Sequence, residues 1–275
     1  MKILNKHYIS ICISVVLLFF STNIFAQTDT TKVNVDGHKI YLYITGKGNN
    51  TVVFESGHGA NHRSWRAVDS AIALNAKVVT YDRPGYLLSD SCLKQRDAIN
   101  TATELKEALT MAGIKPPYIL VGWSLGGAFA RVFCGLYPST VKGLVLVDPT
   151  PEESYARFEK EYPELLKEDS AYINEIMLSR NRPGEKAEMI AFDSSMNQAR
   201  ISDQYHTTPT ILLIAAGGEN RDQANPLNRI WVEELRKWAG KRTNLQFKII
   251  ENSGHHMAKE QPQEVIKAIE TFNYK

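Results

Sequence analysis

The sequence predicts an α/β fold of three layers, in which a mostly parallel β-sheet lies between two layers of helices. From residue 33 onward, short continuous apolar runs alternate with helical patterns. Such runs are typical of parallel strands that are buried on both faces. One run, residues 118–121, leads directly into Gly122-Trp123-Ser124-Leu125-Gly126 and then into a helix-forming stretch. This segment predicts a strand, a sharp turn with a serine at its tip, and a helix.

The individual elements follow from periodicity. Residues 38–45 alternate between apolar and polar side chains, which predicts an early antiparallel strand. Residues 101–111 form a helical pattern that Gly113 ends, and the last helix begins at Pro262. The runs expected to form parallel strands are residues 51–54, 77–81, 118–121, 143–147, 211–214 and 245–250.

One segment, from residue 150 to about residue 208, interrupts this alternation. It contains no strand-like run, and its apolar side chains have helical spacing. Connections in this class of fold are usually about 2–6 residues long, so this segment is too long to be a plain connection. We expect a helical cap inserted over the carboxyl edge of the sheet, within a single domain of residues 27–275.

The first 26 residues predict a secretory signal peptide. Lys2 and Lys6 precede a short apolar stretch, and a small residue, Ala26, stands before a polar segment. The apolar stretch is short for a membrane span, which needs about 20 residues. Ile24 makes the cleavage site imperfect, so an uncleaved membrane anchor is the alternative. We expect cleavage after Ala26, export to the periplasm or the extracellular space, and no stable membrane anchor afterwards.

The composition is that of a soluble globular protein, with 43% hydrophobic and 23% charged residues. Cleavage would remove two lysines and no acidic residue, so the formal net charge would fall from +2 to 0. Nothing in this balance indicates a nucleic-acid partner or an anionic surface. The mature chain would retain Cys92 and Cys134, which we expect to remain unpaired because Cys134 falls in a buried helix. No zinc-binding spacing of Cys or His is present, so no metal is predicted.

The Gly-x-Ser-x-Gly turn predicts a catalytic serine, Ser124, in a strained backbone conformation. Gly122 and Gly126 are small because a Cβ atom there would collide with the neighbouring strand and helix. The alternative is an ordinary glycine-rich turn. A serine nucleophile needs a base, an orienting acid and an oxyanion hole. Near the C-terminus, His255 and His256 follow the run 245–250, where a loop can bring an imidazole over the serine; a surface turn with two solvated histidines is the alternative.

Several motifs in the predicted loops carry a family resemblance. They are the serine turn, Gly254-His255 followed by Glu260-Gln261-Pro262, and Tyr81-Asp82-Arg83-Pro84-Gly85-Tyr86. On these motifs the sequence resembles the α/β-hydrolase superfamily from Val33 to Lys275, in its serine hydrolase and esterase-like branch. The chain order of serine, acid and histidine is that of the family. The resemblance implies that His255, rather than His256, is the base.

The resemblance also implies an oxyanion hole. Glu55-Ser56-Gly57-His58-Gly59 follows the third predicted strand, where the family supplies one donor. If Gly57 matches the glycine of the family's common His-Gly pair, the backbone N–H groups of His58 and Leu125 are the two donors. Ser56 stands where the family usually has histidine. The side chain of His58 is expected to line a pocket or to be solvated.

The third member of the triad has two possible places in the family. One is the tip of the strand that ends at Val147, where this chain has Asp148. The other is the turn after residues 211–214, where the family often has Asp and this chain has Asn220 between Glu219 and Asp222. We favour Asp148, because it is at a strand tip beside the site, and Asp222 and Glu219 remain the alternatives.

The predicted function is that of a secreted serine hydrolase that cleaves a small-molecule ester, or less favourably an amide, without a cofactor. A serine nucleophile argues against the dehalogenase and epoxide-hydrolase branches, which attack through a carboxylate. A non-catalytic binding protein on the same scaffold is the first alternative. The second is a dinucleotide-binding oxidoreductase, for which Gly57, Gly59 and Asp82 form a partial fingerprint that lacks its third glycine.

Overall fold

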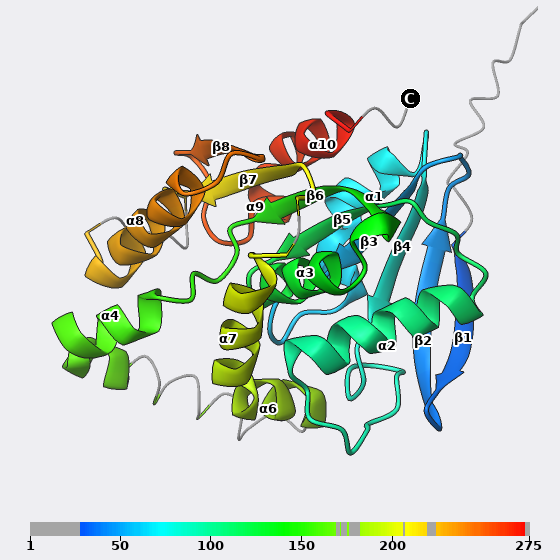
Figure 1. Cartoon of the computed structure of the whole chain (residues 1–275), viewed down its shortest axis with the longest axis horizontal. Helices are drawn as coiled ribbons and strands as arrows, with labels where there is room; N and C mark the ends of the chain where they lie inside the picture. Colours follow the sequence, from blue (N-terminus) through cyan, green and yellow to red (C-terminus); the bar gives the residue numbers. More distant parts are fainter. Residues whose placement is uncertain are drawn as a thin grey trace, which may run out of the picture.

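The computed structural model describes residues 28–168, 171, 175, 182–205, 207–218 and 224–272. The predicted signal peptide, residues 1–26, lies outside the described residues. Within them, eight strands form one sheet in the order β1-β2-β4-β3-β5-β6-β7-β8 (Figure 1). The strands are β1 (Asp29–Val35), β2 (His38–Thr45), β3 (Thr51–Glu55), β4 (Lys77–Asp82), β5 (Tyr118–Trp123), β6 (Val141–Val147), β7 (Thr210–Ala215) and β8 (Leu245–Ile250).

The sheet is mostly parallel, as the sequence predicts. β2 pairs antiparallel with β1 and with β4, and the pairs from β4 through β8 are parallel. The antiparallel prediction for residues 38–45 is therefore confirmed. Strand β1 was not among the predicted strands. Its first residues are polar and exposed, and they are in strand conformation through their pairing with β2.

Two separate apolar clusters cover the two faces of the sheet and make the three layers. On one face the cluster includes residues of α2 (Ala98–Met111), α3 (Leu125–Leu136), α7 (Phe192–Ser202) and α8 (Pro226–Gly240). On the other face it includes residues of η1 (His62–Trp65), α1 (Arg66–Ile72), α9 (Met257–Glu260) and α10 (Pro262–Glu270). The predicted three-layer α/β fold is confirmed.

Local chemistry explains where these helices begin. Asp97 precedes α2, and its carboxylate accepts a hydrogen bond from the backbone N–H of Asn100 at 2.9 Å. Such a cap satisfies one of the N–H groups that the first turn leaves without a partner. Pro226 and Pro262 open α8 and α10, where a missing N–H group costs nothing. A short turn, η2 (Pro138–Thr140), joins α3 to β6.

Between β6 and β7 the chain forms helices rather than strands in its described part. These are α4 (Ser154–Glu161), α6 (Pro183–Ile190) and α7. Helix α7 packs against α2 and α3, and α4 packs against α8. Figure 1 shows α4, α6 and α7 together at one side of the sheet.

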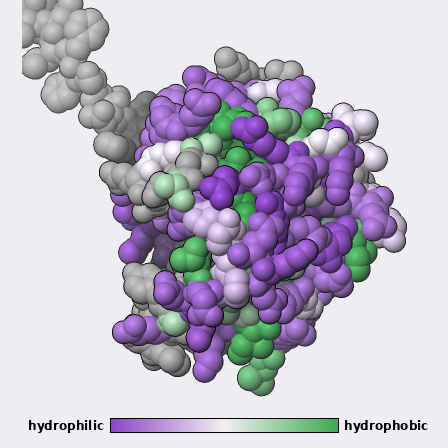
Figure 2. Space-filling model, turned by 90° about the vertical axis from the view of Figure 1, so that its left-hand side faces the viewer, coloured by the Kyte–Doolittle hydropathy of each residue, from purple (hydrophilic) through white to green (hydrophobic). Residues whose placement is uncertain are grey.

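The surface is mainly polar on the face that Figure 2 shows, and its apolar areas are small and separate. Among the described residues, no helix is both long enough and apolar enough to cross a membrane.

Candidate active site

Ser124 lies between β5 and α3 in a backbone conformation that few residues other than glycine adopt. Its φ is 55° and its ψ is −126°. Its N–H donates to Val147 O at 3.3 Å, and its carbonyl oxygen accepts from the N–H groups of Gly127 at 2.9 Å and Thr150 at 3.1 Å. These bonds hold the strained turn in place from both sides. The strained conformation predicted for Ser124 is confirmed.

The glycines that flank the serine are small because the turn is crowded by backbone atoms. A Cβ atom on Gly122 would lie 2.7 Å from Gly126 O, and one on Gly126 would lie 2.4 Å from both Glu55 O and Ser56 O. Real Cβ atoms do not approach backbone oxygens so closely. The end of β3 therefore packs directly against the start of α3, beside the serine.

His255 belongs to the loop between β8 and α9 and faces the serine. Its Nε2 lies 3.0 Å from Ser124 Oγ, and its Nδ1 lies 2.6 Å from Asp148 Oδ2. The imidazole is flanked by the indole rings of Trp123 and Trp231, with ring centroids 5.3 and 5.5 Å away. A proton on Nδ1, donated to Asp148, leaves the Nε2 lone pair directed at the serine hydroxyl.

Asp148 follows the last residue of β6 and is completely buried. Its φ of 43° turns the chain at the strand tip. Besides the contact with His255, its Oδ1 accepts from the backbone N–H of Ala215 at 3.1 Å, and its own N–H donates to Leu213 O at 2.8 Å. The carboxylate is thus fixed between the ends of β6 and β7. The alternative acids, Glu219 and Asp222, lie outside the described residues.

His256 is oriented differently from its neighbour. It is exposed and packs against Trp123 with ring centroids 4.9 Å apart. Where the ring packs against its neighbours it loses contact with water, and this desolvation, followed by the nearby His255, lowers the pKa of His256. His256 is therefore mostly neutral at pH 7.

The residues expected to form an oxyanion hole lie beside Ser124. Gly57 approaches so closely that a Cβ atom on it would be 3.0 Å from Ser124 Cβ. Within the described part of the chain, the backbone N–H groups of His58 and Leu125 have no hydrogen-bond acceptor. The His58 side chain is half-buried, and its Nε2 lies 2.9 Å from Glu185 O in α6. Two unused N–H donors next to a serine are what an incoming carbonyl oxygen requires.

A buried ionic cluster lies behind these donors and was not anticipated from the sequence. Arg83, which follows β4, is 3% exposed and bonds to Glu55 and Glu188. Burial raises the pKa of Glu55, and Arg83 opposes that effect. Glu188 comes from α6, 105 residues along the chain from Arg83, so no local pattern in the sequence could join them.

A second polar group, in which His38 and Glu104 are buried and Cys92 is half-buried, joins β2, the loop after β4 and α2. Possible metal-ligand atoms of His38, Cys92 and Glu104 all lie within 4.8 Å of one another, so the three side chains could hold a metal ion. Arg96 Nη1 lies 2.5 Å from Glu104 Oε2 and 3.2 Å from Cys92 Sγ. A guanidinium already supplies the positive charge there, so we interpret the group as a structural ion pair.

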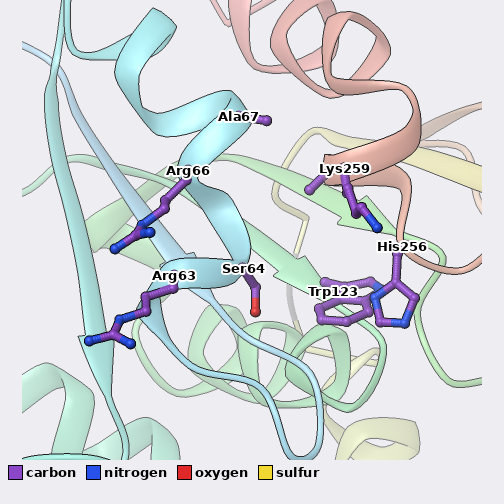
Figure 3. A pocket seen from close by; sticks show the side chains of 8 residues that line it. Arg63, Ser64, Arg66, Ala67, Trp123, His256 and Lys259 are labelled. Atoms are coloured by element: carbon purple, nitrogen blue, oxygen red, sulfur yellow. The ribbon is translucent and has the colours of Figure 1, made fainter.

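A cavity of about 330 Å³ lies on the α1 and α9 side of Trp123 (Figure 3). Trp123 and His256 form one wall, together with Lys259. In Figure 3 the side chains of Arg63 and Arg66 point away from Trp123 and His256, so the positive charges do not converge on one point. Ser124 does not line this cavity, which is therefore separate from the serine hydroxyl.

Asp82, proposed above as a ribose-binding acid in the dinucleotide alternative, already has partners. Its Oδ1 bonds to the backbone N–H of His62 at 3.1 Å and to the ring Nδ1 of His62 at 2.8 Å. Its Oδ2 accepts from the hydroxyl of Tyr43 at 2.9 Å. The side chain is fully buried, which argues against that alternative.

Comparisons with known proteins agree with this fold. A family model described as alpha/beta hydrolase fold matches residues 50–182. The monoacylglycerol lipase ABHD6 of Rattus norvegicus is 26% identical over 253 residues, which cover 81% of this chain and 74% of the lipase. An uncharacterized protein of Bacillus subtilis, YbdG, is 29% identical over 170 residues, which cover 57% of this chain and only 52% of YbdG.

Solved structures with a similar fold include a thermophilic esterase from Thermogutta terrifontis. It superimposes with a TM-score of 0.62 at 19% identity, over 90% of this chain and 98% of the esterase.

Proposed function

The chain belongs to the α/β-hydrolase superfamily, and from that premise we propose that it is a serine hydrolase that cleaves a carboxylic ester. The observation that carries the proposal is the continuous line of contacts from Ser124 Oγ to His255 Nε2 at 3.0 Å and from His255 Nδ1 to Asp148 Oδ2 at 2.6 Å. A nucleophile, a base and an orienting acid in this geometry make a catalytic triad.

In the proposed mechanism, Ser124 Oγ attacks the carbonyl carbon while His255 Nε2 takes its proton. Asp148 holds the imidazole in the tautomer that can accept this proton and stabilises its charged form. The backbone N–H groups of His58 and Leu125 receive the oxyanion. His255 then protonates the leaving alcohol, and a water molecule, deprotonated by the same imidazole, releases the acid and restores the serine.

An ester is favoured over an amide because two of the related proteins are named for activity on esters. ABHD6 is named as a monoacylglycerol lipase, and another relative, from Hamiltonella defensa, is named as a pimeloyl-[acyl-carrier protein] methyl ester esterase. We carry over only the ester class. A panel of acyl esters of graded chain length, with an amide of the best acyl group, would define the substrate.

The test of the mechanism is labelling with a serine-directed phosphonate. Wild-type protein should gain the mass of one phosphonyl group on Ser124, and the Ser124→Ala variant should gain none. Ser124→Ala should fold normally and lose kcat by several orders of magnitude. Retained turnover in the variant would refute the proposal, and an unlabelled, inactive wild-type protein would favour a binding role instead.

From the sequence of residues 1–26 we also propose export, with cleavage after Ala26. Intact-mass analysis of protein from the native cell envelope should give a chain that begins at Gln27. A membrane-bound form that begins at Met1 would contradict this.

A further inference from the structure

Arg83 uses every N–H group of its side chain, although it touches none of the triad residues. Its Nε and Nη2 donate to the two carboxylate oxygens of Glu188, at 2.6 and 3.1 Å. Its Nη1 donates to Glu55 Oε1 at 2.7 Å and to Ser56 O at 2.6 Å. Its Nη2 also donates to Gly57 O at 2.8 Å. A guanidinium has five N–H groups, so none remains for another partner.

The bonds to Ser56 O and Gly57 O fix the backbone that carries the proposed oxyanion donor. Gly57 O and the N–H of His58 belong to the same peptide group, which is trans. In a trans peptide the C=O and N–H bonds point in opposite directions. When Gly57 O is held by Arg83, the N–H of His58 must therefore point away from the guanidinium. Gly57 itself abuts Ser124, so the orientation of this peptide decides whether the N–H of His58 can reach an oxyanion on that serine.

The guanidinium is held in turn by the segment that connects β6 and β7. Glu188, which binds it at two points, belongs to α6 and is completely buried. The hydroxyl of Tyr86 donates to Glu188 Oε2 at 2.7 Å and accepts from the N–H of Gly59 at 3.2 Å. His58 Nε2 contacts Glu185 O in the same helix. Helix α6 and the segment from Glu55 to Gly59 are thus tied together around Arg83.

We propose that Arg83 is a positioning residue that aims the backbone N–H of His58 at the oxyanion, and that Glu188 couples this donor to the position of α6. The inference rests on the proposed function. Its consequence is that a displacement of α6 disturbs transition-state stabilisation even though α6 supplies no group to the triad. Loss of a single oxyanion donor lowers kcat by about 10²–10³-fold, which sets the size of the effect.

The test compares Arg83→Lys with a matched control, Arg131→Lys. Arg131 is also buried and also binds two carboxylates, Asp203 and Glu152, but it has no hydrogen bond or ion pair with the described residues 55–59. A lysine keeps the charge in both variants and cannot make the five-way contact. Arg83→Lys should lower kcat by about 10²-fold and change KM by less than about threefold. Arg131→Lys should lower Tm and leave kcat of the folded protein within about threefold of wild type.

A second measurement reads the oxyanion hole directly. A trifluoromethyl ketone forms a hemiketal with the serine, and the oxyanion of this hemiketal needs the backbone N–H donors. A methyl ketone of the same shape binds mainly as the free carbonyl. Arg83→Lys should weaken binding of the trifluoromethyl ketone by about as much as it lowers kcat/KM, and should leave binding of the methyl ketone unchanged. Glu188→Gln, which keeps the side-chain shape, should show the same pattern with a smaller loss.

The outcomes separate the two proposals. If wild-type protein reacts with the phosphonate but Arg83→Lys and Glu188→Gln lose only Tm, with kcat and trifluoromethyl ketone affinity unchanged, the positioning role is wrong and the proposed function stands. If Arg83→Lys fails to fold, kcat and trifluoromethyl ketone affinity of Glu188→Gln alone decide whether the positioning role is right. If wild-type protein neither hydrolyses esters nor reacts with the phosphonate, the proposed function fails and the inference fails with it.

Discussion

The indole Nε1 of Trp123 donates a hydrogen bond to the backbone carbonyl oxygen of His255 at 2.7 Å. Trp123 immediately precedes the serine, and His255 carries the imidazole that faces it. The residue beside the proposed nucleophile therefore holds the loop of the proposed base, across 132 residues of sequence. This bond holds the backbone of His255 at a fixed distance from the residue that precedes Ser124.

Replacing Trp123 should consequently affect turnover more than folding. A hydrogen bond within a protein contributes about 1 kcal/mol, so Trp123→Phe should lower kcat by roughly fivefold to tenfold. Trp238→Phe is the matched control, because its indole also donates to a fixed acceptor, Asp203 Oδ2 at 2.9 Å, in a contact that does not involve the triad. Equal kcat in both variants would contradict the role of Trp123.

Asp148→Asn should lower kcat by about 10⁴-fold, by analogy with the same change in serine proteases. The amide oxygen can still accept from Ala215 N–H, but the amide nitrogen cannot accept from His255 Nδ1 and favours the wrong tautomer. Asp222→Asn and Glu219→Gln should each lower kcat much less. The measurement is kcat in protein whose folding has been checked by thermal unfolding. If Asp222→Asn is the inactive variant, the acid belongs after β7.

Gly126→Ala should reduce the free energy of unfolding by about 1–3 kcal/mol, because its Cβ atom would meet backbone oxygens of β3 and of the segment after it. Gly240→Ala, at the end of α8, is the control. A Cβ atom there meets nothing within 4 Å, and alanine favours a helix over glycine by up to about 1 kcal/mol. Denaturant unfolding of both variants should therefore give changes of opposite sign.

The two thiols of residues 27–275 should differ in reactivity. Burial raises the pKa of Cys134 to about 12, against a smaller opposing effect of its hydrogen bond to Thr208. A raised thiol pKa favours the neutral form, so at pH 8 Cys134 is almost entirely the thiol and not the thiolate, which is the reactive species. A disulfide reagent at pH 8 should modify Cys92 in the folded protein and Cys134 only after unfolding. Rapid modification of both would contradict this.

Raising the pH should also destabilise the fold through Cys134. The unfolded thiol ionises near its ordinary pKa of 9.0, whereas the folded thiol stays neutral until about pH 12. The stability of the fold is therefore unaffected by this thiol below pH 9, and it falls progressively as the pH rises from there toward the pKa of the folded thiol. Cys134→Ala should remove this part of the pH dependence, which pairs of unfolding curves between pH 8 and pH 10 would reveal.

The sequence by itself determined those features that depend on local pattern. Apolar runs marked the parallel strands because these strands are buried on both faces, and glycine on both sides of Ser124 marked a turn too crowded for a Cβ atom. The register of Gly254 and His255 against the family motif distinguished His255 from His256. Strand β1 was not predicted because its first residues are polar, and an edge strand depends on its partner rather than on its own burial.

Only the tertiary structure decided which distant groups meet. Arg83 and Glu188, or His255 and Asp148, come from different loops and helices, and their contacts depend on strand order and on the path of the chain between β6 and β7. The periodicity of the sequence does not predict such a pairing, because each residue can adopt its local backbone conformation without its distant partner. Burial makes the pairing necessary, since a charge removed from water needs a counter-charge and hydrogen bonds, and the fold alone determines which residue supplies them.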